Sequence, residues 1–276
     1  MFALAIPQSL KGWEVMWAIS VLLYVILKLL SWCSVRRADS PLWKHWAYLL
    51  AWPGMDAEAF LFKSLDGKVS SPKVSEWCFA FAKLAGGLIL VFAIIPAIGI
   101  DSPYFVGWLG MVAMILCLHM GLIHLLSCWW RSCGAYAAPI MNWPILATGL
   151  SDFWGQRWNL AFRDLTHRFV FRPLAKRHGM KTALVVAFVL SGLIHDLAIS
   201  VPAQGGYGLP TLYFCLQGLG VLLEKSRLGK HIGLGSSLLG WCFAALCLLV
   251  PIQLLFHRSF VVGVFYPFLQ FLGATS

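Results

Sequence analysis

The chain has 276 residues, of which 60% are hydrophobic and only 12% are charged, against about 45–50% and 25% in ordinary soluble domains. So few polar side chains could not cover the surface of a soluble globule, and the same composition excludes disordered, collagen-like and disulfide-framework proteins. The formal charge of +10 fits a positive-inside bias and an anionic membrane face, so no nucleic acid partner is expected. The sequence therefore predicts an all-α, polytopic integral membrane protein.

Apolar runs of roughly 20 residues are long enough to cross a bilayer. Five runs meet or nearly meet that length: 13–32, 77–100, 103–127, 182–201 and 234–256. The runs 208–224 and 260–273 are shorter, and counting them we expect about eight transmembrane helices in a single domain over residues 1–276. Because Arg36 and Arg37 follow the first run, we expect it to be an anchor and not a cleaved signal.

Two further apolar stretches, 42–52 and 135–150, are interrupted or ended by Pro53, Pro139 and Pro144. A bilayer tolerates such breaks where protein covers the free backbone groups. We therefore expect both stretches to be re-entrant or interfacial helices.

Lysine and arginine predict the orientation. Placing the loops 33–76, 128–181 and 225–233 in the cytoplasm leaves only Lys11 and Arg258 on the other side. The N-terminus would then lie outside and the C-terminus inside. The membrane would be the inner membrane of a bacterial cell or the endoplasmic reticulum of a eukaryotic one.

The densest positive charge lies between residues 157 and 181, with Asp164 as its only acid. The cations are Arg157, Arg163, Arg168, Arg172, Lys176, Arg177 and Lys181. Apolar residues recur at spacings near three and four from Trp158 to Phe169, which predicts an amphipathic helix along the cytoplasmic interface. Such a helix would bind anionic lipid, or its cations would also bind a phosphorylated cosubstrate.

The run 182–201 contains the string SGLIHD, which places His195 and Asp196 inside a span. Ionisable residues are costly there and need an explanation. Ser191 and His195 share a helix face, whereas Asp196 points about 100° away. Two interpretations stay open: a histidine hydrogen-bonded to a neighbouring helix, or a neutral imidazole that takes a proton from an alcohol.

A second unusual string, SDFWGQRWN, occupies residues 151–159. Trp154 and Trp158 suit membrane-interface anchors, and the amide of Asn159 can donate a hydrogen bond to a carbonyl. Neither HExxH nor a Cys/His cluster occurs, and His119 and His124 are five residues apart on different helix faces. No metal site and no bound cofactor are therefore expected.

These strings carry a resemblance to a known family. SDFWGQRWN, then RDLTHRFVFRPL, then SGLIHD within a span resemble the wax-synthase-like branch of the membrane-bound O-acyltransferases. AWPGMD at 51–56, LYFCLQGLGVLLE at 212–224 and LFHRSFVVGVFYPFLQFLGA at 255–274 add to it. The resemblance covers roughly residues 51–274, in the family's order.

The resemblance implies a polytopic helical fold around a tunnel, with acyl-CoA entering from the cytoplasmic side as cosubstrate. The family's intramembrane histidine falls on His195 and its polar loop residue on Asn159. Many members carry His at the second position, and the acid after the histidine is commonly Glu where this chain has Asp196.

The function expected from the residues and the resemblance together is transfer of a fatty acyl group from acyl-CoA to a long-chain alcohol, which forms a wax ester. His195 would be the general base, assisted by Asn159. The predicted acyl-CoA-binding residues are Trp154, Arg157, Trp158, Arg163, Arg168, Arg172 and Ser191. The alternatives are a sterol, diacylglycerol or glycolipid acceptor, or a lipid transporter in which His195 and Asp196 relay protons. The oligomeric state is left open.

Overall fold

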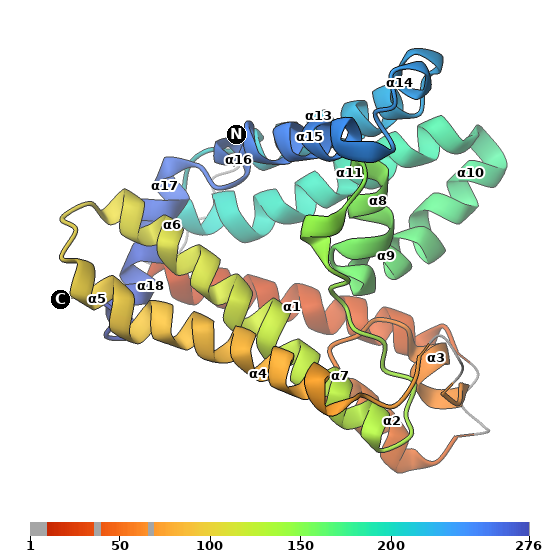
Figure 1. Ribbon diagram of the computed structural model, residues 1–276, viewed down its shortest axis with the longest axis horizontal. Coiled ribbons are helices and arrows are strands. Elements are labelled where there is room, and N and C mark those ends of the chain that lie inside the picture. Colours follow the sequence, from red (N-terminus) through yellow and green to blue (C-terminus); the bar gives the residue numbers. More distant parts are fainter. Residues whose placement is uncertain (1–9, 36–39, 66–68, 276) are drawn as a thin grey trace.

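The computed structural model describes residues 10–35, 40–65 and 69–275, so Arg36 and Arg37 lie outside the described residues. Within that part of the chain the all-α prediction is confirmed, because the ordered elements are helices joined by turns and irregular segments (Figure 1). Five helices of the described residues are long and apolar enough to cross a membrane: Gly12–Cys33, Val74–Ile98, Pro103–Ser132, Met180–Ala203 and Leu238–Leu255. They coincide with the five long runs predicted from the sequence.

Most of these long helices contain a π-helical turn between α-helical parts. Up to residue 132 the elements are α1 (Gly12–Cys33), α2 (Leu42–Ala51), α3 (Ala57–Phe62), α4 (Val74–Ile89), η1 (Leu90–Ile94), α5 (Ile95–Ile98), α6 (Pro103–Met114), η2 (Ile115–Leu122) and α7 (Ile123–Ser132). The middle of the chain forms η3 (Pro144–Leu146), α8 (Leu150–Asp152), η4 (Phe153–Arg157), α9 (Leu160–Thr166), η5 (His167–Phe171), α10 (Arg172–His178), α11 (Met180–His195), η6 (Asp196–Ser200) and α12 (Val201–Ala203). The remainder forms α13 (Leu209–Glu224), α14 (Arg227–His231), α15 (Ser237–Leu249), α16 (Ile252–Leu255), α17 (Arg258–Phe260), η7 (Val261–Phe265) and α18 (Tyr266–Phe271).

The two ends of the helix bundle differ in charge. The short helices α2, α3, α10 and α14 gather at the right-hand end in Figure 1, which we call the basic end. Their cations are Lys44, Arg172, Lys176, Arg177, Arg227 and Lys230. Lys11 and Arg258 lie instead where α1 and α17 begin, at the opposite end. This distribution agrees with the predicted grouping of the basic loops on one side.

The C-terminal run does not cross the bundle. Residues 258–271 form one helix of α17, η7 and α18, whose Phe271 ring stacks on Trp13 at 4.4 Å. Because Trp13 lies in the first turn of α1, the C-terminal helix ends beside the start of α1. For the described part of the chain, from Leu10 to Thr275, the expectation of ends on opposite sides is therefore wrong. Fourteen helical residues reach about 21 Å, too short for a bilayer core.

The described residues therefore contain fewer transmembrane helices than the expected number of about eight. Besides the five long helices, the described chain offers α13 as a sixth, shorter apolar helix. The helix 258–271 packs across α6, where a Cβ on Gly107 would meet Val261 and one on Gly110 would meet Leu269. Those two glycines let the helices approach closely, so this run is buried against protein.

The two proline-broken stretches behave differently. The stretch 42–52 forms α2, which exposes Leu42, Trp43, Trp46 and Leu50 on one face and so suits a membrane interface. The stretch 135–150 is not the helix we expected, because apart from the 3₁₀ turn η3 it is irregular. Its backbone pairs with the motif region instead: Asn142 N–H donates to Arg157 O (2.8 Å), and Leu160 N–H donates to Ile140 O (2.9 Å).

Candidate active site

The SGLIHD string holds α11 tightly against α13. A Cβ on Gly192 would lie 2.6 Å from the Cα of Thr211, so only glycine permits this approach. The Asp196 carboxylate accepts hydrogen bonds from Gly208 N–H (2.8 Å), Thr211 N–H (3.1 Å), the Thr211 hydroxyl and the Ser200 hydroxyl (2.8 Å). Gly208 is the N-cap of α13, so Asp196 caps that helix from a neighbouring one.

His195 lies at the C-terminal end of α11, directly before the π-turn η6. Its Nδ1 is 2.7 Å from the backbone carbonyl oxygen of Ser191. A carbonyl only accepts, so Nδ1 carries the hydrogen and a neutral ring has its lone pair on Nε2. Ser191 and His195 share a helix face, as predicted, and the Ser191 backbone carbonyl fixes the His195 tautomer that a general base requires.

Aromatic rings connect His195 to the SDFWGQRWN string. The His195 ring centroid lies 4.5 Å from that of Phe214 on α13, and the Trp154 ring lies 5.6 Å from the same Phe214. Trp154 also contacts Phe188 of α11 edge-on at 6.0 Å. Its indole N–H points to the buried Gln217 side chain (3.4 Å). Trp154 is therefore held among protein helices and does not act as a lipid-facing anchor.

Asn159 has a left-handed backbone (φ 43°) and is the N-cap of α9. Asparagine tolerates this conformation better than most residues. Its side-chain Oδ1 accepts from Phe162 N–H at 3.2 Å. The cap uses only the amide oxygen, so the NH₂ group is able to donate to a substrate carbonyl. Trp158, directly before it, stacks on Phe153 with ring centroids 5.6 Å apart.

Glu224 fixes the start of this string from the far end of α13. Its buried carboxylate accepts from Leu150 N–H (2.5 Å), Ser151 N–H (3.1 Å) and the Ser151 hydroxyl. Those amides open the helix made of α8 and η4, so the carboxylate caps it and compensates its dipole. One helix, α13, thereby positions both motifs with Asp196 at its start and Glu224 at its end.

The predicted CoA-binding arginines fall into two groups. Arg157 donates to Asp152 (2.6 Å) and to Trp143 O (3.2 Å), and Arg163 pairs with Asp164 (3.1 Å). Burial acts to raise the pKa of Asp152, but hydrogen bonds from Thr148 and Arg157 outweigh it and hold that pKa below its usual value. The charges of Arg157 and Arg163 are thus balanced within the protein.

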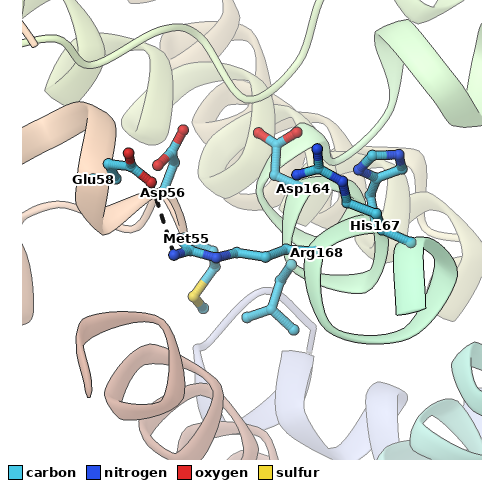
Figure 2. Close-up of a pocket in the computed structure, with 8 residues that line it drawn as sticks. Met55, Asp56, Glu58, Asp164, His167 and Arg168 are labelled. Atoms are coloured by element: carbon cyan, nitrogen blue, oxygen red, sulfur yellow. Dashed lines mark ion pairs between the residues drawn. The ribbon is translucent and has the colours of Figure 1, made fainter. Parts of the chain in front are cut away.

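Arg168 and Arg172 instead line a pocket of about 300 Å³ at the basic end. Figure 2 shows Arg168 extending toward Glu58, with Asp56 on the same side as Glu58 and Asp164 and His167 on its own helix. The Arg168–Glu58 ion pair is long, at 3.8 Å. Burial raises the pKa of Asp164, although the neighbouring Arg163 opposes this. Arg168 and Arg172 therefore keep part of their positive charge available.

A separate polar cluster joins α4 to the helix η2–α7. Ligand atoms of Glu76, His124 and Cys128 lie within 4.8 Å of one another. Lys83 Nζ contacts one His124 ring nitrogen (2.7 Å), Glu76 contacts the other (2.9 Å), and Arg131 pairs with Glu76. The two cations beside the candidate ligands, Lys83 and Arg131, disfavour a divalent metal ion, and the cluster serves to hold the helices together.

Comparison with known proteins addresses the residues just described. Residues 137–216 match the Membrane bound O-acyl transferase family, a segment that contains His195, Asn159, Trp154 and Phe214. The predicted resemblance is confirmed.

Three related proteins show how far the likeness extends. A long-chain-alcohol O-fatty-acyltransferase of Simmondsia chinensis is 39% identical over 67 residues, which cover 21% of this chain and 19% of that protein. The acyl-CoA–sterol O-acyltransferase 1 of Arabidopsis thaliana is 38% identical over 66 residues, with the same coverage. The probable long-chain-alcohol O-fatty-acyltransferase 8 of Arabidopsis thaliana is 33% identical over 106 residues, 34% of this chain and 30% of the relative. The matched part thus spans less than a third of each relative.

Some site residues have no sequence signal of their own. Phe214 and Gln217 lie in an apolar helix, and their contacts with Trp154 join residues about 60 positions apart. Glu224 is the exception, because an acid at the end of an apolar run indicates a polar partner in the fold. In the structure, Trp154 and His195 both contact the ring of Phe214. Arg168 and Arg172 line one pocket.

Proposed function

We propose that the protein transfers a fatty acyl group from acyl-CoA to the hydroxyl of a long-chain alcohol in the membrane. The observation that carries the proposal is the fixed tautomer of His195, whose Nε2 lone pair lies within the segment that matches the acyltransferase family. The relatives' names support the reaction class, and two name a long-chain alcohol as acceptor.

In the proposed reaction, Nε2 of His195 takes the proton of the alcohol as its oxygen attacks the thioester carbonyl carbon. The carbonyl oxygen becomes negative, and the NH₂ group of Asn159 donates to it. The C–S bond then breaks, the ester forms, and the CoA thiolate recovers the proton from His195. A thioester is already activated, so no acyl-enzyme intermediate is required.

The predicted acyl-CoA contacts remain part of the proposal, with Trp154 beside the reacting groups and the arginines toward the basic end. Ser191 contributes through its backbone carbonyl. A sterol acceptor is the nearest alternative, since one relative is named for it. The proton-relay alternative is less favoured, because four hydrogen bonds already engage the Asp196 carboxylate, three of them from the start of α13.

The test is turnover by the purified protein with acyl-CoA and a long-chain alcohol, followed by free CoA thiol and by mass spectrometry of the ester. We expect His195→Ala to lower turnover by about three orders of magnitude or more, since it removes the base and its positioning. His119→Ala is the matched control, because His119 lies in a different span, in η2. Near-normal turnover of His195→Ala, or equal loss in both variants, would refute the assignment.

A further inference from the structure

A second pocket at the basic end has an unusual lining. It holds about 500 Å³ and is lined by Arg168, Arg172, Pro173, Lys176 and Arg177. Four of the five are cations, and none is an acid. The acids near this helix, Asp56, Glu58 and Asp164, line the neighbouring pocket, which shares Arg168 and Arg172 with this one.

The helix geometry explains why the cations converge. Arg168, Arg172 and Lys176 follow one another at four-residue spacing, which places them on one helix face, and Arg177 follows Pro173 at the same spacing. The π-turn η5 lies directly before Arg172, and such turns are frequent at functional sites. The helix then ends at Gly179, whose φ of 83° allows the sharp reversal into α11.

The charges of this pocket are largely uncompensated. Among the ion pairs of the described residues, none involves Arg172, Lys176 or Arg177, and Arg168 has only the long contact to Glu58. Arg157 and Arg163, by contrast, are paired with Asp152 and Asp164. Like charges that line one pocket repel one another, and an anion bound among them relieves that repulsion.

We propose that Arg168, Arg172, Lys176 and Arg177 form a binding site for a phosphate group that carries more than one negative charge. Guanidinium forks and an ammonium group suit such an anion through charge-assisted hydrogen bonds. At a membrane surface two carriers present this chemistry, an anionic phospholipid headgroup and the nucleotide part of CoA. The CoA case rests on the proposed function, and the phospholipid case does not.

The test compares two variants that lose equal charge. Lys176→Gln/Arg177→Gln removes two cations from the pocket, whereas Lys225→Gln/Lys230→Gln removes two exposed cations of the same end that do not line it. Calorimetry in neutral detergent measures the Kd of adenosine 3′,5′-bisphosphate. Native mass spectrometry of protein from phosphatidylcholine nanodiscs with phosphatidic acid measures the retained anionic lipid.

We expect the pocket variant to raise the nucleotide Kd about tenfold, or to lose the retained phosphatidic acid, while the control changes either by less than about twofold. Loss of nucleotide binding alone identifies CoA as the carrier, and loss of lipid alone identifies the headgroup. Equal losses in both variants, or none in either, overturn the site. Binding needs no turnover, so His195→Ala should bind as the wild type does, and failure of the acyl-transfer proposal would be seen separately.

Discussion

Asn159 combines a structural contact with a proposed catalytic one, and the two use different atoms. Its Oδ1 caps α9 through Phe162 N–H, whereas the proposed reaction uses its NH₂ group. Replacing Asn159 by alanine would remove both roles, so a loss of activity in that variant would not separate them.

Aspartate at this position separates the two roles. Asn159→Asp keeps an oxygen for the cap and a residue type that tolerates a positive φ, but it removes the donor. We expect thermal stability to be retained and kcat to fall by about 10²–10³, with the KM for acyl-CoA little changed. If Asn159→Asp retains normal kcat, the residue is a cap alone.

Asn159→His tests the likeness to family members that carry histidine there. A histidine caps a helix elsewhere in this structure, where His257 Nδ1 accepts from Phe260 N–H at 3.3 Å. Its other ring nitrogen would then be free to donate. We therefore expect Asn159→His to retain partial activity, measured as ester formation. Complete loss of activity would show that the geometry of the amide is essential.

Phe214 is predicted to orient the His195 ring. An aromatic contact of this kind contributes about 0.5–1.5 kcal/mol, so Phe214→Leu should lower kcat by about two- to thirteenfold. Phe188→Leu is the control, because Phe188 contacts Trp154 and lies on α11 itself. An equal loss in both variants would attribute the effect to packing around Trp154.

At the scale of elements, α13 is positioned by acids at both of its ends. Asp196 caps its start and Glu224, its last residue, caps the helix of α8 and η4. We expect Asp196→Ala to reduce the free energy of unfolding by about 2 kcal/mol or more, since several donors lose their acceptor. Thermal unfolding in detergent measures this, with His195→Ala expected to stay close to wild type. A stable Asp196→Ala protein would contradict the capping role.

The helix α17–η7–α18 should respond to pH through its cap, His257. Burial lowers the pKa of His257, and the nearby Asp196 carboxylate opposes this only in part. A lowered folded pKa means that the unfolded chain binds the proton more readily, so stability is present above about pH 6.5 and is lost as the pH falls below it. Ser200 lies beside the other ring nitrogen (3.4 Å). We expect Tm to fall on acidification, and His257→Asn, which caps without titrating, to reduce that fall.

Local patterns predicted some of these elements and missed others. The helical course of residues 160–169 followed from the spacing of apolar residues, and the five long spans followed from length and hydropathy alone. The irregular course of residues 135–149 was not predicted by any local pattern, because it depends on backbone pairing with Arg157 and Leu160. The pairing of Glu224 with Leu150 and Ser151 likewise joins positions more than 70 residues apart, which no local pattern reveals.

At the scale of the whole molecule, the position of the last helix changes the count of crossings. The sequence predicted an outer N-terminus and an inner C-terminus, which requires an odd number of spans. The helix 258–271 lies against α1 and α6 and ends beside the start of α1. The number of crossings between those two points is therefore even, and α13 makes the sixth beside the five long helices of the described residues. Length and hydropathy could not reveal this, because the run is apolar for contact with protein and not for contact with lipid.

The stacking of Phe271 on Trp13 has a practical consequence for reporter fusions. An even number of crossings places the start of α1 and the end of α18 in the same compartment, and this contact holds them close together. The two halves of a split fluorescent protein, one fused to each end, should therefore reassemble and fluoresce without either half crossing the bilayer. Moving one half to the loop between α13 and α15, at the basic end, should abolish the fluorescence.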